Sequence, residues 1–441
     1  MAMPGLTFAA VRRAWRDPVY ANGIALVLNS GTASALGFLF WLVIARRYSS
    51  AEFGWGAAVV SASTLAALIG KAGFDAAIIR YGPSSSVRVL RKLVAQAALA
   101  SVLLTAVVSG IVLALADTSL VTSLAPLRAP PAAIGFLALA CGTVLAWVFD
   151  AFFIAEQTAL YTLYRNMAFN LVKLVAPFAI AVTFASFAVP LSWGAGLAVS
   201  VLVAIALVPV ALRRRRPAAT VPPPSRAEVA LYSAKNYVLN VSEFLPSLLL
   251  PILVLEMMGP VANARFFLAW TIASVGFLGS KAIAQSSFAA LVREGRPHTA
   301  LSKGARLAMW LLAPLVVFLL VFAPLLLRLF GQGGHADAIL LLRLLALSFA
   351  PVTVTNLYLS YLKARQAGWE LTILPAATLL VTIGSAIPAL TLGMSALGWL
   401  WLGVQTLAAG YAGARLTIML KRNHHGVTNN MPRIGRRAHE G

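Results

Sequence analysis

The chain has 441 residues, of which 60% are hydrophobic and 11% are charged, whereas a soluble domain has about 45–50% and about 25%. Its mean hydropathy is +0.85. One core cannot bury so many apolar side chains, so most of them must face lipid or other helices. This composition excludes a soluble globular protein and indicates an integral membrane protein.

The chain carries 35 lysines and arginines against 13 acidic residues, for a net charge of +22. In a soluble protein this charge suggests nucleic acid binding, but in a membrane protein basic residues collect in cytoplasmic loops and set the orientation. No nucleic acid partner is therefore expected. The one cysteine, Cys141, excludes an intrachain disulfide and a cysteine-based metal site.

A bilayer core of about 30 Å is crossed by about 20 helical residues. Segments of this length and character recur at residues 21–45, 53–79, 93–116, 132–156, 167–188, 192–212, 236–257, 262–290, 305–330, 338–362, 368–391 and 394–420. The first segment is too long for a signal-peptide core, so it is expected to be a retained span. The sequence thus predicts an all-α, polytopic membrane protein with about 12 transmembrane helices.

One long connection, residues 213–235, joins an arginine run to a proline cluster and is expected to be a cytoplasmic linker. It separates a six-helix bundle over residues 1–212 from a second over 236–420, followed by a basic tail over 421–441. Because the number of spans is even, both termini lie on one side. Most basic residues fall on that side, so the positive-inside rule makes both termini cytoplasmic.

Two halves of six spans each would form a parallel internal repeat, related by an axis along the membrane normal. A shift of 211 residues places Asn29 on Asn240 and Lys71 one position from Lys281. Two matches at one offset favour such a repeat.

Ionisable side chains inside spans are costly and are functional candidates by default. They are Lys71, Asp75, Asp150, Lys173, Glu243, Lys281 and Arg415. For Lys173 and Arg415 we favour snorkelling, in which the long stem carries the charge to the cytoplasmic headgroups. Lys71 has Asp75 four residues on, so an intrahelical ion pair is possible. Lys281 has no acid three or four residues away, which makes it the cation least explained by local pairing.

Asp150 and Glu243 have short side chains and need a partner, water or a proton. One interpretation is a proton-coupled transporter, and the other is a hydrogen bond or ion pair to a neighbouring helix. Pro246 and Pro251 follow Glu243 in the same span and are predicted to act as a hinge.

Motifs for nucleotide binding, metalloprotease or serine hydrolase chemistry do not occur in the sequence. We therefore expect no catalytic residue, no metal site, no cofactor and no enzymatic activity, with H⁺ or Na⁺ coupling left open.

Several stretches carry a family pattern. Residues 28–82 hold an aromatic run into Ala-Arg, a loop with Phe-Gly, and a helix ending near Gly and Arg, at Phe40, Trp41, Ala45, Arg46, Phe53, Gly54, Gly73 and Arg80. Residues 150–174 and 236–286 fit the later spans of the same pattern. The chain resembles the bacterial polysaccharide (O-antigen) flippases of the multidrug/oligosaccharidyl-lipid/polysaccharide (MOP) exporter superfamily.

This resemblance implies two six-helix bundles around a central cavity in the bacterial inner membrane. The cargo would be a polyprenyl-diphosphate-linked oligosaccharide, moved to the outer leaflet for polysaccharide biosynthesis. Expected partners are this lipid-linked glycan, membrane lipids, and a glycan polymerase or glycosyltransferases of the pathway. Because a diphosphate needs paired positive charge, the predicted substrate-binding cations are Lys281, Lys71, Arg46, Arg80 and Lys173. The coupling or gating candidates are Glu243, Asp150, Asp75, Asn29 and Asn240.

Three alternatives remain. A cation-coupled multidrug exporter of the same superfamily would favour an acidic cavity, whereas in-span cations here outnumber acids by four to three. A major-facilitator carrier usually has an Asp-Arg motif after its second span, and residues 78–92 contain no acid. A membrane-embedded glycan polymerase or ligase would need a long external loop, and the longest ones here are short.

Overall fold

The computed structural model describes residues 18–425 except 117, 119–120, 181, 216–225, 295–296, 332–334, 366 and 368. The N-terminal basic residues, the centre of the predicted linker and the tail beyond residue 425 lie outside the described residues. The first helices and turns are α2 (Pro18–Arg47), α3 (Ser50–Lys71), α4 (Phe74–Tyr81), α5 (Val87–Leu115), η1 (Thr122–Arg128), α6 (Pro130–Ala155), α7 (Ala159–Ala179), η2 (Val182–Phe187) and α8 (Ala188–Arg214). The remaining helices are α9 (Arg226–Glu294), α10 (Pro297–Leu329), α11 (Ala336–Leu347), α12 (Phe349–Ala364), α13 (Glu370–Gly384), α14 (Ala386–Thr391) and α15 (Met394–His425).

The predicted all-α fold is confirmed, since the described ranges contain helices and turns and no strand. Nine helices in these ranges are long and apolar enough to cross a membrane. One of these helices, α9, covers two predicted spans. Two more predicted spans fall on α7 and α15, which are less apolar and are not among the nine. The structure thus has a helix, or a pair of short helices, at each of the spans expected from hydropathy.

The chain divides into two compact units. Unit 1 comprises residues 1–267 and 330–332, and unit 2 comprises residues 268–329 and 333–441. By this division the first part of α9 belongs to unit 1, whereas the sequence analysis divided the chain at the linker, residues 213–235. The predicted division into bundles over residues 1–212 and 236–420 therefore stays a prediction.

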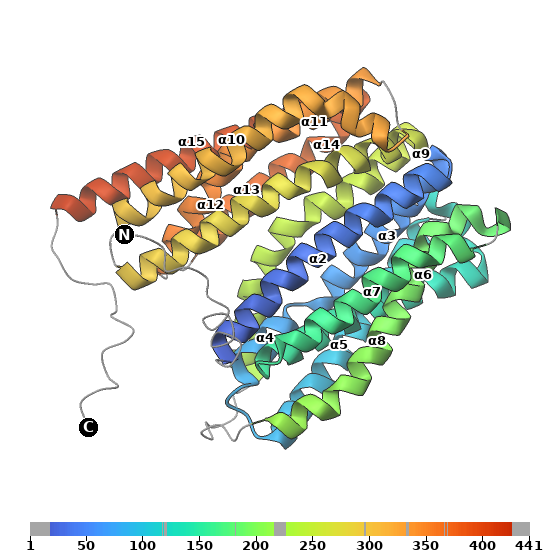
Figure 1. Cartoon of the computed structure of the whole chain (residues 1–441), viewed down its shortest axis with the longest axis horizontal. Coiled ribbons are helices and arrows are strands. Elements are labelled where there is room, and N and C mark those ends of the chain that lie inside the picture. Colours follow the sequence, from blue (N-terminus) through green and yellow to red (C-terminus); the bar gives the residue numbers. More distant parts are fainter. Residues whose placement is uncertain are drawn as a thin grey trace, which may run out of the picture. The chain divides into compact units, whose positions relative to one another are not determined.

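In unit 1, α7 lies beside both α2 and α8 (Figure 1). Close packing is possible because Gly196 of α8 lies against the backbone of α7, where an added Cβ would stand 2.6 Å from the carbonyl oxygen of Phe169. A buried cluster that includes Phe153, Tyr161 and Ala204 joins α6, α7 and α8 to α5. These contacts hold α7 among the other helices of unit 1.

The helix α7 begins at Ala159, eight residues before the expected span start at 167. Two consequences correct the sequence analysis. Arg165 falls outside the expected span 167–188, between two spans, but lies in the second turn of α7 and is 3% exposed. Lys173 lies near the start of the expected span 167–188, but it lies in the second half of α7. The reason is that the polar residues at the start of α7 lowered its hydropathy although they are buried against other helices.

The second expected span is interrupted. The helix α3 ends at Lys71, and Ala72 and Gly73 follow with left-handed φ angles of 47° and 78°. Asp75 then lies in the first turn of α4. Lys71 at a helix C-terminus and Asp75 at a helix N-terminus both have the charge that the local helix dipole favours.

The long helix α9 has one residue with non-helical backbone angles, Gly259, at φ 82° and ψ 173°. Its angles stay helical at Pro246 and Pro251, so the hinge role of these prolines stays a prediction. Next to Gly259, the Glu256 carboxylate accepts hydrogen bonds from the backbone N–H of Thr122, at 2.9 Å, and from its hydroxyl, at 2.8 Å. These bonds fasten this part of α9 to η1.

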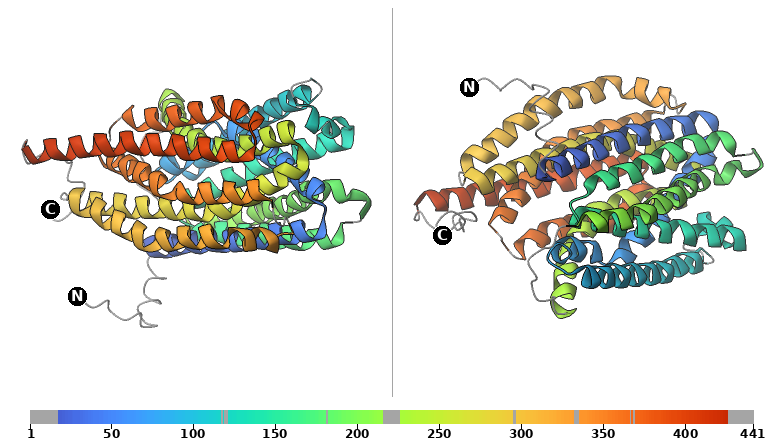
Figure 2. Two further views of the ribbon diagram at one scale, coloured as in Figure 1. Left: turned by 90° about the horizontal axis from the view of Figure 1, so that it is seen from above. Right: turned by 60° about the horizontal axis from the view of Figure 1, so that its bottom comes forward.

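In unit 2, α15 contacts α11 and α12, and α10 contacts the same two helices (Figure 2). Pro324 of α10 has no N–H to donate to the carbonyl of Leu320, four residues earlier. Arg343 of α11 supplies that hydrogen bond instead, with its Nε 2.9 Å from the Leu320 oxygen. A neighbouring helix therefore satisfies the group that proline leaves free, as expected in a membrane.

Candidate functional site

A cavity of about 410 Å³ lies within unit 1, and three of the charged residues predicted from the sequence line it. Helices α3, α4, α6 and α9 contribute its walls. Its lining residues are Thr64, Leu68, Lys71, Asp75, Ile79, Trp147, Asp150, Ala151, Ile154, Phe244 and Leu248. Three ionisable side chains thus meet in one otherwise apolar cavity.

Lys71 and Asp75 form the first charged pair in this cavity. The Lys71 Nζ lies 2.8 Å from the Asp75 Oδ2, and 5.2 Å from the ring centre of Trp147. The Lys71 side chain is 8% exposed and that of Asp75 is 21% exposed. The ion pair expected from the spacing is therefore present, although it bridges the break between α3 and α4 instead of following one continuous helix.

Asp150 pairs with Arg165 across α6 and α7. The Arg165 Nε donates to Asp150 Oδ1 at 3.1 Å and Nη2 donates to Asp150 Oδ2 at 2.5 Å. This is the two-point geometry that makes arginine–carboxylate pairs strong. Of the two interpretations of Asp150, the ion pair to a neighbouring helix is the one that the structure contains.

The Arg165 guanidinium also donates to Asn166 Oδ1 at 2.7 Å and to the hydroxyl of Ser200 in α8 at 2.6 Å. The Asn166 amide in turn donates to Asn29 Oδ1 of α2 at 2.9 Å. Because the amide oxygen of Asn166 accepts from arginine, its amide nitrogen is the group left to face Asn29. Four helices thus meet in one polar network, which includes Asn29 from the predicted gating residues.

Lys173 lies in an aromatic cage. Its Nζ is 4.2 Å from the ring centre of Trp193, 4.5 Å from that of Phe169 and 5.0 Å from that of Phe40. The residue is 3% exposed, so the snorkelling expected from the sequence is wrong for this lysine. No ion pair joins Lys173 to a carboxylate within the described ranges, and ring faces stabilise its charge instead.

The other predicted residues do not join this group. Arg46 and Arg80 are exposed, the first at the end of α2 and the second in α4. Lys281 is half-buried in unit 2, and Glu243 is exposed on α9. Asn240 lies one turn before Glu243 in α9.

Arg415, also expected to snorkel, instead lies 3.2 Å from the carboxylate of Glu370. This pair belongs to unit 2, and each side chain is about a third exposed, at 36% and 33%.

One arginine of the predicted linker has a structural role. The Arg215 Nη1 lies 2.9 Å from Glu156 Oε1, and Nη2 donates to the carbonyl oxygens of Gly82, at 3.0 Å, and of Ser85. Its side chain is 8% exposed. Arg215, which was assigned only to the predicted linker, therefore binds other parts of the chain.

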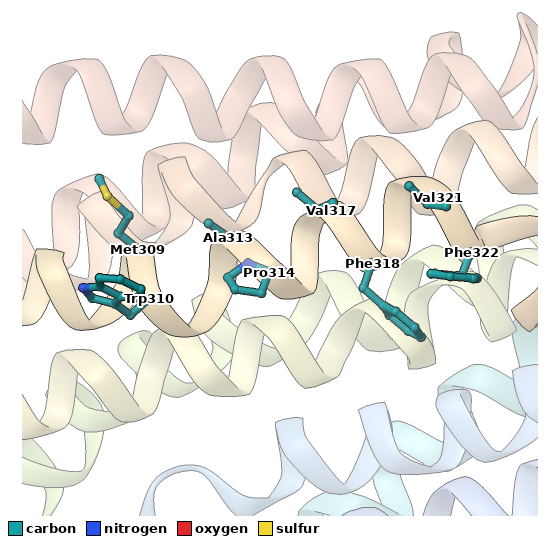
Figure 3. A pocket seen from close by; sticks show the side chains of 8 residues that line it. All are labelled: Met309, Trp310, Ala313, Pro314, Val317, Phe318, Val321 and Phe322. Carbon is teal, nitrogen blue, oxygen red and sulfur yellow. The ribbon is translucent and has the colours of Figure 1, made fainter.

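A second hollow, of about 660 Å³, lies on α10 in unit 2 and contains no ionisable side chain (Figure 3). The side chains that line it come from this one helix and are Met309, Trp310, Ala313, Pro314, Val317, Phe318, Val321 and Phe322. Trp310 is 78% exposed. An apolar helix face of this kind suits contact with lipid and offers no groups for chemistry.

Sequence reasoning missed Arg165, Asn166 and Ser200 as site residues. A signal was present, because Arg165, Asn166 and Asn170 recur at helical spacing on the stretch before Lys173. Read as one polar helix face, this pattern would have moved the start of the span toward residue 159.

No protein-family model matches the sequence, and no curated protein matches it. Solved structures do share the fold. An inward-facing conformation of a multidrug resistance MATE family transporter of the MOP superfamily aligns with a TM-score of 0.64 at 16% identity, over 91% of this chain and 99% of the other. An outward-facing conformation of such a transporter aligns with a TM-score of 0.54 at 18% identity, over 92% of this chain and 97% of the other.

A third structure is a MOP superfamily transporter from Pyrococcus furiosus, described as having a binding pocket of reverse polarity that suggests a different function. It aligns with a TM-score of 0.50 at 18% identity, over 93% of each chain. The chain therefore has the two-bundle fold of MATE transporters. At 16–18% identity this likeness shows the fold alone, so the superfamily and its polysaccharide flippase branch stay predictions.

Proposed function

We propose that this protein is an alternating-access flippase, which moves a polyprenyl-diphosphate-linked oligosaccharide from the cytoplasmic to the outer leaflet of the bacterial inner membrane. One observation carries the proposal. Among the described residues of unit 1, three cations are buried at 6% exposure or less, namely Lys71, Arg165 and Lys173. Asp75 and Asp150 pair with the first two, so Lys173 leaves one positive charge in excess.

A net positive interior suits an anionic cargo. A diphosphate that leaves water must regain its lost hydration from cations and hydrogen-bond donors. An organic cation would instead need an excess of carboxylates. The lipid tail of such a cargo can stay in the bilayer while its head crosses, which suits a protein whose extramembrane segments are short.

The proposal includes partners and orientation. Lipid-linked glycan and membrane lipids would contact the protein directly, and a glycan polymerase or glycosyltransferases would act before and after it. Both termini would be cytoplasmic, as the distribution of basic residues favours. H⁺ or Na⁺ would drive transport.

Reconstitution into liposomes tests the transport step. A polyprenyl diphosphate that carries a fluorescent oligosaccharide is added to both leaflets, and a membrane-impermeant quencher reports the molecules that reach the outside. We expect loss of nearly all fluorescence with the protein and half without it. Lys173→Gln should slow the exchange about tenfold or more, whereas Lys363→Gln, at an exposed lysine of α12, should leave it unchanged.

A deletion strain tests the role in cells. Without the protein, lipid-linked glycan should accumulate on the cytoplasmic leaflet, and Lys281→Ala should reproduce much of that defect. Normal glycan export in a deletion strain that has no redundant transporter would contradict the flippase function.

A cation-coupled multidrug exporter is the second candidate. Two carboxylates, Asp75 and Asp150, line the cavity, and the solved structures that share the fold include multidrug resistance transporters. Uptake of an organic cation dye into inverted vesicles distinguishes the two. Dye transport that is lost in Asp75→Asn, without movement of the lipid-linked sugar, would favour the exporter.

A further inference from the structure

The surroundings of the Arg165 guanidinium consist of oxygen atoms. Four of its N–H groups donate at 2.5–3.1 Å, two of them to Asp150, one to Asn166 and one to Ser200. The arginine is 3% exposed and Ser200 is 0% exposed. The acceptors come from three helices, α6, α7 and α8.

A shell of carboxylate, amide and hydroxyl oxygens is the chemistry that proteins use to bind hard cations. Its carboxylate supplies one negative charge, which a single positive charge neutralises. Asn29 supports the shell from α2, because it accepts from the Asn166 amide and so holds the Asn166 oxygen toward the guanidinium. The shell is therefore built by four helices and matched to one cation.

We propose that unit 1 contains a monovalent-cation site formed by Asp150, Asn166 and Ser200, and that the chain fills this site with its own cation, the Arg165 side chain. A cation tethered on the same helix as Asn166 has an effective concentration in the millimolar range or above. A mobile ion does not displace it at ordinary salt concentrations. Asp150 then serves as a counter-ion, and a driving H⁺ or Na⁺ binds elsewhere.

The arrangement of charge around Asp150 supports this site. Asp150 lines the cavity of unit 1 together with Lys71 and Asp75, which neutralise each other at 2.8 Å. Asp150 therefore does not have to neutralise Lys71, because Asp75 does so. The carboxylate can stay with Arg165 while the cavity is empty or occupied.

Removing the Arg165 side chain should open the site to free guanidinium, a cation with the same donor group. We would purify Arg165→Ala and follow thermal unfolding with a thiol-reactive fluorogenic dye, because Cys141 is the only cysteine. Guanidinium chloride, far below denaturing concentrations, should raise the unfolding midpoint. At ten times the dissociation constant, the ratio of folded to unfolded protein rises about elevenfold.

Three controls separate filling of the site from general effects. The wild type has the site filled, so guanidinium should not raise its midpoint. Arg47→Ala removes an exposed arginine of α2 that donates to a backbone carbonyl, that of Pro177, and leaves no oxygen shell behind. Urea at the same concentration should raise none of the three midpoints. An equal response to guanidinium in Arg165→Ala and Arg47→Ala would overturn the proposal.

The single variant leaves a buried carboxylate unpaired and can fail to fold, so a second variant is needed. In Asp150→Asn with Arg165→Gln, both charges are removed and side-chain size is nearly kept. We expect this double variant to fold and to be insensitive to guanidinium. A double variant no more stable than the single one would count against the proposal.

An experiment with Na⁺ tests whether a mobile ion, instead of Arg165, occupies the site. Stabilisation of the wild type by Na⁺ that disappears in Asp150→Asn would place a mobile ion at Asp150 and overturn the proposal. These readouts are stabilities, so they stand or fall separately from transport of a lipid-linked sugar.

Discussion

The two units treat polar groups in different ways. Among the described residues, the lysines and arginines that are buried at 6% exposure or less are Lys71, Arg165 and Lys173, and all three belong to unit 1. The buried polar side chains of unit 2 are serines and threonines, such as Ser280 and Thr353. Hydroxyls can bond to the carbonyl one turn earlier on their own helix, whereas charges need partners on other helices. Within the described residues, buried charge is therefore concentrated in unit 1, and the buried polar groups of unit 2 are hydroxyls.

The largest effect should come from a single broken charge pair in unit 1. Asp150→Asn leaves the Arg165 guanidinium buried without a counter-charge, which costs about 3–5 kcal/mol of unfolding free energy. Reversible unfolding in mixed micelles would measure it. The control in unit 2, Glu370→Gln, breaks a pair that is about a third exposed and should shift stability far less. Equal losses would remove the contrast between the units.

A second effect tests the bond that replaces the missing N–H of Pro324. Arg343→Met leaves the Leu320 carbonyl without its donor and should cost about 1.5–3 kcal/mol, the range for hydrogen bonds to charged groups. Pro324→Ala restores a backbone donor, so Arg343→Met should cost much less in that background. A double-mutant cycle on the unfolding free energy measures this coupling. Additive losses would show that Arg343 acts in another way.

A smaller effect is expected for a buried hydroxyl of unit 2. The Thr353 hydroxyl lies 2.8 Å from that of Ser280 and 2.7 Å from the carbonyl oxygen of Phe349. Thr353→Val removes these bonds with little change of volume and should cost about 1 kcal/mol. The same unfolding measurement checks it. A loss near that of Asp150→Asn would mean that the hydroxyls of unit 2 form a network as important as the charges of unit 1.

The smallest effect on stability is expected at Lys173. Lys173→Met removes the contacts of the ammonium group with three ring faces, which stabilise the fold by about 2 kcal/mol or more when they are desolvated. It also removes the free-energy cost of burying that ammonium group. The lost stabilisation and the removed cost nearly cancel, so the unfolding free energy should change by less than about 1 kcal/mol. Transport of the lipid-linked sugar should nevertheless fall. Unchanged transport would show that Lys173 supports packing alone.

Much of the fold was predictable from local sequence. Hydropathy located a helix at every expected span, because a backbone that crosses lipid must satisfy its hydrogen bonds within a helix. The pairing of Lys71 with Asp75 followed from a spacing of four residues. The break after Lys71 was harder to foresee, since Ala72 has a left-handed φ that alanine rarely adopts.

The polar centre of unit 1 was predictable only in part. Asp150 was identified because a carboxylate inside a span is unusual, and Asn29 because a shift of 211 residues places it on Asn240. Arg165 was not, because its neighbours lowered the hydropathy of the stretch and it fell between two expected spans. Lys173 was identified as a charge within a span, but its aromatic cage draws rings from α2, α7 and α8, which the sequence does not bring together.

The sequence by itself determined that this is an all-helical membrane protein, where its helices lie and which charges need an explanation. These properties depend on composition and on near neighbours along one helix. Tertiary structure decided which charge meets which partner, as with Asp150 and Arg165, or Lys173 and Trp193. Such meetings depend on which faces of separate helices pack together. Each residue turns a helix by about 100°, so an error of one residue in register changes the facing side chains.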